Sequence, residues 1–233
     1  MTRVRSFALV LTGLGWMACE KWTRRTRPTS EEKHKRLPGD ELVTRPMWQA
    51  TRSITIHAPR DAVWPWLVQM GYPTYRAGWY TPYWMDRVTL GIRARSADRI
   101  IADLQNLAPG DHVPDSPDAT VAYFTVVEIA EDRALVLTSH THPLPIYRDV
   151  AFSWAFILED DRGGADTRLM MRARIAYTPV GPGPIIRFLV STGFGIGDIL
   201  QAGAMLGGIK TRVEADRATR NCAPTPSRRP ALV

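Results

Sequence analysis

The chain has 233 residues, 45% hydrophobic and 23% charged, which is typical of a globular domain rather than a disordered chain. Its formal net charge of +7 belongs to the two terminal segments, because the basic residues outnumber the acidic ones there and not in residues 37–209. The central part therefore offers no basic surface of the kind that binds nucleic acid. The two cysteines, Cys19 and Cys222, provide no disulfide framework, and we expect no bridge between them.

Residues 1–22 begin with two arginines and continue with an apolar run from Phe7 to Cys19. This run is shorter than the roughly 20 residues of a spanning helix, and the order of charge and apolar run also suits a secretory signal. Seven basic residues follow by Arg36, and such charge resists translocation. We therefore favour an N-terminal anchor that holds the protein at the cytoplasmic face of a membrane, with the membrane surface as a partner. The alternatives are a secreted protein and a soluble cytoplasmic protein with a basic tail.

Residues 23–46 are polar and proline-containing, which predicts a linker that partly docks on the domain spanning residues 47–217. The domain opens with a short strand over Thr51–Pro59, in which Ile54 and Ile56 share a face.

The stretch DAVWPWLVQMG, residues 61–71, predicts a helix of about two to three turns. Four apolar residues repeat at helical spacing: Val63, Trp66, Leu67 and Met70. With Asp61 as the cap, Pro65 lies just past the first turn, where it removes only the earliest backbone bond. We expect Val63 and Leu67 to be buried and one of Trp64 and Trp66 to be more exposed.

Residues 71–110 begin with a segment rich in aromatic residues. The apolar residues that follow suggest a short helix or turn near Ile100–Leu107. Alternating apolar residues then predict antiparallel strands. These strands cover Val121–Ile129, Ala134–Ser139, Asp149–Glu159 and Thr167–Tyr177. In the last strand three arginines alternate with apolar residues, which predicts a sheet with one face in water. The arginines are Arg168, Arg172 and Arg174.

The C-terminal part predicts a helical segment from Ile185 to about Ala215. Apolar residues at helical spacing form one face of it: Ile199, Ala202, Leu206, Ile209 and Val213. The glycines of GFGIGD, residues 193–198, predict a break or kink, and Gly203 and Gly207 predict close packing. Residues 218–233 have the composition of a disordered tail.

Several motifs between Leu37 and Ala215 carry a family resemblance: LPGDELV, ITIHAPRDAVWPWLVQMG, RAGWY, SADRI and FTVVEI. Together they resemble the SRPBCC superfamily, which includes START-like lipid-transfer domains, polyketide cyclases and pollen-allergen-like proteins, and most of all a bacterial branch of unassigned function. The resemblance implies an α+β helix-grip (START-like) fold, in which a curved antiparallel sheet wraps around a long C-terminal helix and leaves an apolar cavity. In YTPY, Tyr83 stands where branch members often have an acid, and Asp86 is a candidate substitute.

Three apolar residues of the strand Asp149–Glu159, namely Phe152, Trp154 and Phe156, form a stripe that we expect to face inward. The candidate site residues are this stripe and polar residues near it, since apolar pockets carry a few polar groups for orientation. The predicted ligand-binding residues are Trp66, Gln69, Arg76, Tyr80, Arg99, Phe152, Trp154, Phe156 and Tyr177. The stripe Phe152 to Phe156 suits a cavity lining or a solid core equally. Arg76 and Arg99 suit a carboxylate or phosphate group, with a surface ion pair as the alternative for each.

Three functions remain open at this stage. The first is binding, transport or sequestration of a hydrophobic small molecule, such as a lipid or polyketide-like compound, near a membrane. The second is a cyclase, aromatase or dehydratase that uses acid–base residues, for which Asp86, Tyr80 and His140 are the candidates. The third is a structural or partner-binding domain with a filled core. We expect no cofactor and no metal, because His140 and His142 have ligand spacing but no evident third ligand.

Overall fold

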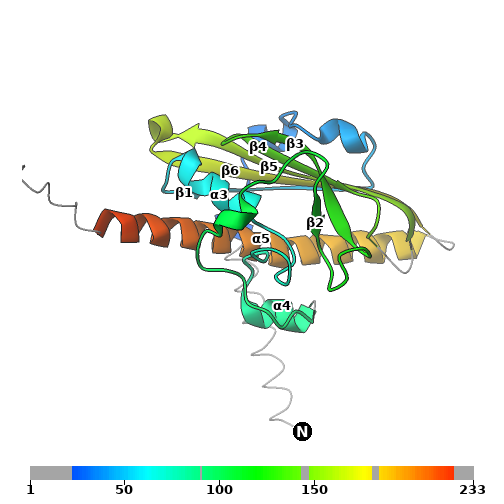
Figure 1. The fold of residues 1–233 in the computed structure, drawn as a ribbon. Helices are drawn as coiled ribbons and strands as arrows, with labels where there is room; N and C mark the ends of the chain where they lie inside the picture. Colours follow the sequence, from blue (N-terminus) through cyan, green and yellow to red (C-terminus); the bar gives the residue numbers. More distant parts are fainter. Residues whose placement is uncertain (1–22, 90, 143–146, 180–183, 223–233) are drawn as a thin grey trace, which may run out of the picture.

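In the described part of the chain, six strands form one antiparallel sheet that curves over the long helix α5 (Figure 1). The computed structural model describes residues 23–89, 91–142, 147–179 and 184–222. The strand order is β1-β6-β5-β4-β3-β2. The strands are β1 (Trp48–Ile56), β2 (His112–Pro114), β3 (Tyr123–Ala130), β4 (Ala134–Ser139), β5 (Tyr147–Asp161) and β6 (Asp166–Pro179). This is the predicted helix-grip arrangement, and the predicted fold class is confirmed.

The helices are short apart from α5. They are α2 (Ser30–His34), η1 (Asp40–Val43), α3 (Arg60–Val68), α4 (Tyr83–Thr89), η2 (Ala102–Leu104), η3 (Arg162–Gly164) and α5 (Pro184–Cys222). The sequence did not predict α4 or β2, whereas the expected short helix or turn near residues 100–107 is the single turn η2. None of the helices in these described ranges is both long and apolar enough to cross a bilayer, and the predicted anchor lies outside them.

The concave face of the sheet packs on α5 through one large apolar cluster. The strands contribute alternate residues, including Phe124, Leu137, Phe156 and Met171. The helix contributes Ala202, Met205, Leu206, Ile209 and Val213. Four of these were predicted from helical spacing, and the side chain of Ile199 lies outside the described residues. Each fully buried aliphatic side chain of this kind stabilises the fold by about 1.5–3 kcal/mol.

Helix α5 runs without interruption from Pro184 to Cys222, so the predicted break at residues 193–198 is wrong. A glycine in a helix costs about 1 kcal/mol relative to alanine. Burial of the helix against the sheet exceeds that cost, and tertiary packing therefore decides the local structure. The helix also reaches Cys222, past the expected start of the tail at residue 218.

Helix α3 begins at Arg60, after Pro59, so Asp61 lies inside the helix and not at its cap. Pro65 is consequently two residues deeper in the helix than expected. Val63 and Leu67 are buried as predicted, but Trp64 (8% exposed) and Trp66 (0%) are buried as well, and the expected contrast between them is slight. Trp66 packs edge-on against the ring of Tyr80, with the ring centres 5.8 Å apart, so the loop before α4 contributes to its burial.

The convex face of the sheet differs most from prediction, because it is not left to water. Residues 26–43 lie across it, and Leu37 packs in a second apolar cluster with residues of β4, β5 and β6. Arg172 of β6 is only 3% exposed and donates to the carbonyl oxygens of Glu32 and Lys35, both at 2.7 Å, and to Asp40 at 2.8 Å. The predicted linker is therefore docked on the sheet by an arginine that was expected to be solvated.

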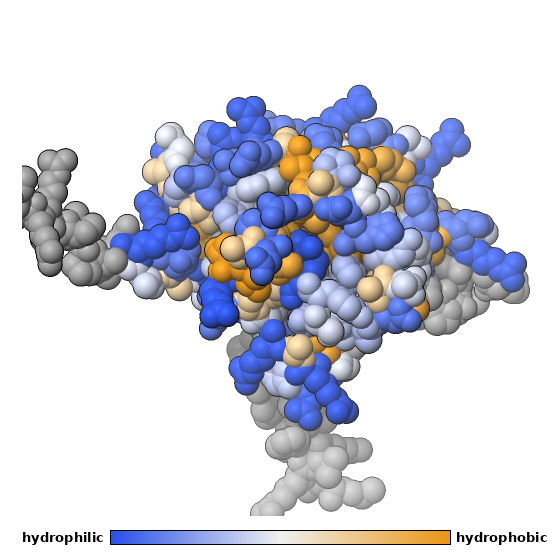
Figure 2. Space-filling model, viewed as in Figure 1, coloured by the Kyte–Doolittle hydropathy of each residue, from blue (hydrophilic) through white to orange (hydrophobic). Residues whose placement is uncertain are grey.

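The outer surface is mainly hydrophilic on the face seen in Figure 2, with several hydrophobic patches between polar residues. Helix α4 stands apart from the sheet and α5 at one side of the molecule (Figure 1). Trp84 and Val88 of α4 are the two most exposed large hydrophobic residues in the described structure, at 61% and 77%.

Candidate functional site

A cleft of about 900 Å³ lies between the outer edge of β1, helix α5 and the loop before α4. This volume suits a small organic molecule. One wall consists of Arg25, Thr26, Ile54 and Thr55, together with Arg168. The floor is the α5 surface, made of Gly203, Ala204, Gly207, Gly208, Lys210, Thr211, Arg212 and Glu214. The opposite wall is Tyr80, Thr81, Pro82, Tyr83, Arg95, Ser96 and Asp98.

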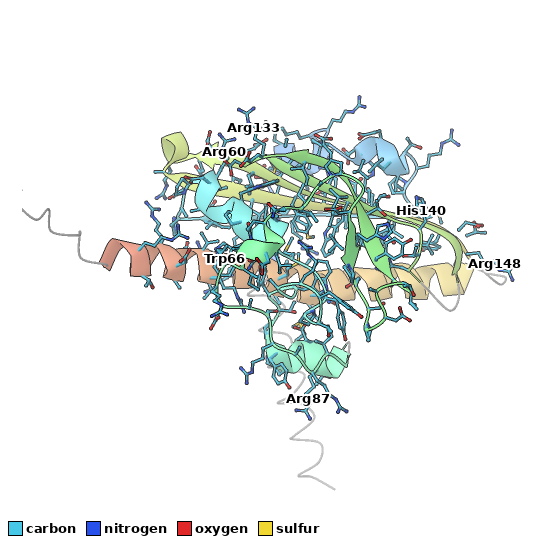
Figure 3. All side chains as sticks on the ribbon, in the orientation of Figure 1. Arg60, Trp66, Arg87, Arg133, His140 and Arg148 are labelled. Carbon is cyan, nitrogen blue, oxygen red and sulfur yellow. The ribbon has the colours of Figure 1, made fainter. Side chains whose placement is uncertain are left out.

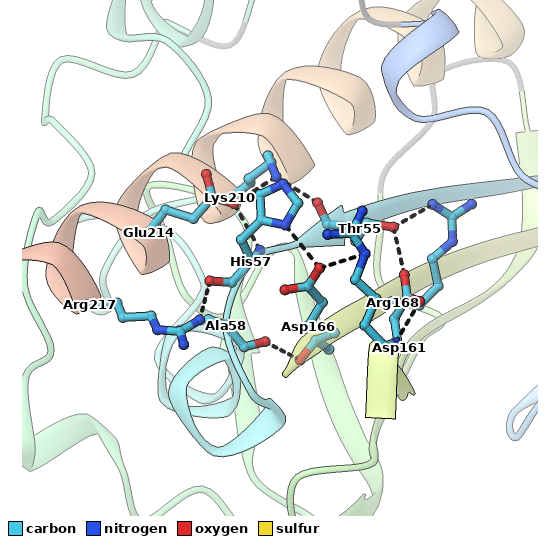
Figure 4. Close-up of polar contacts among 11 residues, drawn as sticks. Thr55, His57, Ala58, Asp161, Asp166, Arg168, Lys210, Glu214 and Arg217 are labelled. Atoms are coloured by element: carbon cyan, nitrogen blue, oxygen red, sulfur yellow. Dashed lines mark hydrogen bonds and ion pairs between the residues drawn. The ribbon is translucent and has the colours of Figure 1, made fainter. Parts of the chain in front are cut away.

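Two of the basic residues that line the cleft are neutralised by carboxylates of the protein. Lys210 Nζ lies 2.7 Å from Glu214 Oε1 and donates to the carbonyl oxygen of Thr55 at the same distance (Figure 4). Arg168 is paired with Glu32, with its Nε 2.7 Å from Oε1. Lys210 thereby satisfies a backbone carbonyl at the edge of the sheet, and both pairs contribute to the walls of the cleft.

Tyr80 lies where the cleft meets the apolar core, and its backbone has a positive φ of 61°. Such a conformation is strained for a non-glycine residue and persists only where its surroundings hold it. Here the backbone N–H of Tyr80 donates to Ser96 Oγ at 3.0 Å, and its hydroxyl donates to the carbonyl oxygen of Trp66 at 3.0 Å. Gln69 Nε2 donates to the same hydroxyl at 2.9 Å. Tyr80 is thus held at both ends.

Titratable groups with shifted pKa values gather around Tyr80. Burial raises the pKa of the Tyr80 phenol above its ordinary value. Burial also raises the pKa of Asp86, although the hydroxyl of Thr81 donates to this carboxylate and opposes the shift. The guanidinium of Arg212 lies 5.0 Å from the centre of the Tyr80 ring, and burial lowers its pKa. Such clusters are typical of functional sites.

A second region of interest is an aromatic wall on the concave face, defined by Trp79, Phe124, Phe152, Trp154 and Phe156. The ring centre of Trp154 lies 5.3 Å from that of Trp79, 5.2 Å from that of Phe124 and 5.0 Å from that of Phe156. The predicted stripe of Phe152, Trp154 and Phe156 therefore faces inward as expected. Phe156 is fully buried, whereas Phe152 and Trp154 remain partly exposed.

Three indole N–H groups are buried without a hydrogen-bond acceptor in the part of the chain that the structure describes, those of Trp66, Trp79 and Trp154. Buried polar groups are nearly always paired, and an unpaired one costs about 1–3 kcal/mol. Because Trp79 and Trp154 are in ring contact, two of these donors border the aromatic wall.

Two of the predicted polar ligand contacts are engaged by the backbone instead. Arg76 donates from Nε to the carbonyl oxygen of Met70 and from Nη2 to that of Val68, both at 2.6 Å. Its positive charge thus lies at the C-terminal end of α3, where it satisfies the last carbonyls. Gln69 accepts from the backbone N–H of Ile101 at 2.9 Å, in addition to its bond with Tyr80.

The remaining predicted ligand contacts are spread over the molecule. Arg99 is exposed, and Tyr177 is buried in a small cluster with Val150 and Ile175. Of all the predicted ligand-binding residues, Tyr80 alone lines the cleft.

The three acid–base candidates do not meet in the described structure. The Tyr80 hydroxyl is bound to Trp66 and Gln69, the Asp86 carboxylate accepts from Thr81, and His140 is exposed. No acid–base pair of the kind that a cyclase needs is therefore formed by these residues.

Sequence reasoning considered His142 only as a metal ligand, but its ring joins two loops. Its Nε2 lies 2.9 Å from Asp115 Oδ2 and its Nδ1 lies 2.7 Å from Ser139 Oγ. Ser139 Oγ also accepts from the backbone N–H of Thr141 at 3.2 Å. This arrangement anchors the chain after β4 to the chain after β2. Over the described residues, no three His, Cys, Asp or Glu side chains are grouped in a way that could hold a metal ion.

No protein-family model matches the chain, and no curated protein matches it. Solved structures that are similar include protein NE0264 from Nitrosomonas europaea, with 15% identity and a TM-score of 0.41. The match covers 73% of this chain and 96% of that protein. A START superfamily protein from Mycobacterium smegmatis has 14% identity and a TM-score of 0.39, covering 72% and 97%. CalU16 from Micromonospora echinospora has 15% identity and a TM-score of 0.33, covering 73% and 86%. The helix-grip assignment rests on the strand order of the sheet and on the packing of α5 against it.

Proposed function

We propose that the protein binds a hydrophobic small molecule, such as a lipid or polyketide-like compound, against the aromatic wall. The observation that carries this proposal is that Phe152 and Trp154 face inward and yet stay partly exposed. A ligand that covers them gains about 25 cal/mol for each Å² of apolar surface removed from water.

The unpaired indole N–H groups of Trp79 and Trp154 add a chemical preference. A ligand that carries a carbonyl or hydroxyl oxygen among its apolar atoms can accept a hydrogen bond from them. Binding is favoured over catalysis because Asp86, Tyr80 and His140 are each engaged elsewhere or exposed.

The experiment is native mass spectrometry of small molecules retained by the purified full-length chain, followed by titration with N-phenyl-1-naphthylamine, a neutral apolar fluorophore. We expect Phe152→Ala to weaken binding of this probe by about tenfold, because it removes an aromatic contact worth a substantial part of the binding free energy. Val127→Ala is the matched control, since Val127 is an exposed apolar residue of β3. A chain that retains no molecule and does not bind the probe would instead have a filled core and a structural function, whereas equal binding by both variants would show that the probe does not bind at the aromatic wall.

We also propose that the protein acts at the cytoplasmic face of a membrane, held there by residues 1–22. The support for this is the order of apolar run and basic residues in the sequence. Fractionation of cells that express the full chain tests it, with a chain lacking residues 1–22 as the comparison. Recovery of the full chain in the soluble or the extracellular fraction contradicts the proposal.

A further inference from the structure

We infer that the cleft between β1, α5 and the loop before α4 is a second binding site, which takes the phosphate group of an organic molecule. This site is separate from the aromatic wall, and nothing in the proposed function requires it. Its volume of about 900 Å³ is far larger than a free phosphate ion needs, so the phosphate would be one part of a larger ligand.

The charges of the cleft favour an anion once the internal ion pairs are taken into account. Lys210 and Arg168 are neutralised by Glu214 and Glu32, as described above. Glu214 is further engaged by the backbone N–H of His57, at 2.9 Å. Neither of these pairs therefore adds a net charge to attract or repel an anion.

Two guanidinium groups remain available on opposite walls. Arg25 is exposed, and within the described residues no hydrogen bond or ion pair is made to its guanidinium. Arg95 is exposed and stacks on the ring of Tyr83, with its Cζ 4.8 Å from the ring centre, and no other described residue forms a hydrogen bond or ion pair with its guanidinium. A third guanidinium, that of Arg212, donates from Nε to Ala97 and from Nη1 to Gly208, and lies near the exposed Asp98.

This set of donors suits a phosphate better than a carboxylate. A guanidinium presents paired N–H groups that match two oxygens of a phosphate, and the tetrahedral phosphate has oxygens for donors on both sides. A carboxylate has only two oxygens in one plane and would satisfy one wall.

The floor of the cleft is open to a ligand. A Cβ atom built at Gly207 would have no other atom within 4 Å, so the helix backbone is bare at this point. The strained backbone of Tyr80 lies at the same cleft, as do two groups with shifted pKa values, the Tyr80 phenol and the Arg212 guanidinium. Strain and perturbed titration are both found preferentially at binding sites, and here they coincide with the available arginines.

The phosphate could belong to a soluble compound or to a phospholipid, and α4 distinguishes the two sources. Tyr83 both lines the cleft and begins α4, and Trp84 and Val88 are exposed one turn apart on that helix. Tryptophan favours the interface between a membrane and water. A lipid source would therefore bring these two side chains against the bilayer, whereas a soluble ligand would leave them without effect.

The test is calorimetric titration of the full-length chain with glycerol 3-phosphate, with sodium chloride adjusted to constant ionic strength. We expect the double variant Arg25→Ala, Arg95→Ala to raise the Kd by about tenfold for each arginine removed. The control is Arg133→Ala, Arg148→Ala, which removes the same charge from exposed positions elsewhere (Figure 3). The control should change the Kd by less than about twofold, because distant surface charges are screened by salt.

A second variant keeps the test independent of charge. Gly207→Leu places a side chain in the floor of the cleft, where its Cβ atom meets no other atom within 4 Å, and it should block binding. Its circular dichroism spectrum and urea midpoint, compared with those of the wild type, show that a loss of binding is not a loss of folding. Sedimentation with vesicles of phosphatidylglycerol or of phosphatidylcholine then separates the sources. If the phosphate belongs to a lipid, two double variants should reduce binding to phosphatidylglycerol vesicles. One combines Trp84→Ala with Val88→Ala, and the other combines Arg25→Ala with Arg95→Ala. A soluble source predicts that only glycerol 3-phosphate binding responds, and only to the cleft variants.

The inference is overturned if wild-type protein binds neither glycerol 3-phosphate nor phosphatidylglycerol vesicles. It is also overturned if the two double-arginine variants weaken binding equally, because the effect would then be one of net charge. Binding of N-phenyl-1-naphthylamine at the aromatic wall should stay unchanged in the cleft variants, so failure of one site does not imply failure of the other.

Discussion

Gly207 and Gly208 are neighbours on α5, yet a methyl group at the two positions should have opposite effects on stability. At Gly208 a Cβ atom would lie 1.8 Å from the carbonyl oxygen of Tyr80 and 2.9 Å from its carbonyl carbon. At Gly207 it would meet nothing within 4 Å. The sequence had suggested close packing at Gly207, but the structure gives that position to Gly208.

The expected loss of stability in Gly208→Ala follows from the overlap between the added methyl group and the backbone of Tyr80. Non-bonded heavy atoms rest about 3.5 Å apart, so α5 and Tyr80 would have to separate by roughly 1.5 Å. Tyr80 cannot yield easily, because its N–H is bound to Ser96 and its hydroxyl to Trp66 and Gln69. Overpacking costs about 1–3 kcal/mol, and each buried hydrogen bond that breaks costs about 1 kcal/mol more. We expect Gly208→Ala to lower the free energy of unfolding by about 3 kcal/mol.

Gly207→Ala should instead raise the free energy of unfolding by about 0.5–1 kcal/mol, because alanine is the better helix former and no clash opposes it. Both values are measured by urea unfolding followed by circular dichroism and tryptophan fluorescence. If Gly208→Ala proves as stable as the wild type, then α5 does not rest on the Tyr80 carbonyl and the description of the cleft is wrong.

Three further predictions concern buried polar groups. Arg172→Met should lower the free energy of unfolding by about 3–5 kcal/mol in urea, because it leaves the carbonyl oxygens of Glu32 and Lys35 without this donor and removes one of the two arginines that pair with Asp40. Arg148→Met, at an exposed site, should change it by less than about 0.5 kcal/mol, and equal effects would show that residues 26–43 are not docked. Asp86→Asn should stabilise the protein at neutral pH and lose this advantage as the pH falls toward 4. The reason is that the raised pKa of Asp86 means that the wild-type carboxyl favours folding only while protonated. A gain in stability that is the same at every pH contradicts this prediction. Tyr80→Phe should be about 1–2 kcal/mol less stable than the wild type at neutral pH, and it should lose stability less steeply above about pH 10. The reason is that the raised pKa of Tyr80 makes ionisation of the phenol oppose folding there. The same dependence of stability on pH in both proteins above about pH 10 would contradict this prediction.

The sheet and its inner face were predictable because alternation with a period of two reports which residues share a face. The predicted strand Ala134–Ser139 matches β4, and the stripe of β5 faces inward as expected. The same alternation could not show what covers the outer face. Arg172 looks like a solvated residue in its own strand, and only its long-range bonds to residues 32–40 reveal that it is buried.

The cleft could not be predicted from the sequence for a similar reason. It joins residues 25–26, 54–55, 80–83, 95–98 and 203–214, and no local pattern connects these segments. The sequence predicts Tyr80 only as one of several polar residues of an apolar pocket, and the structure places it in the wall of the cleft. The charge of Arg76 suggests an anionic ligand, but its guanidinium donates to the carbonyl oxygens of Met70 and Val68 at the end of α3, a long-range contact that no local pattern reveals.

The docking of residues 26–43 on the convex face also has a mechanical consequence. The carbonyl oxygen of Thr26 accepts from the N–H of Ser53 on β1, at 3.1 Å, and the preceding residue, Arg25, is part of the cleft wall. Only Thr23 and Arg24 separate Arg25 from the first 22 residues of the chain. A partner that binds those residues would therefore be tied to the molecule directly beside the cleft and not to a distant face.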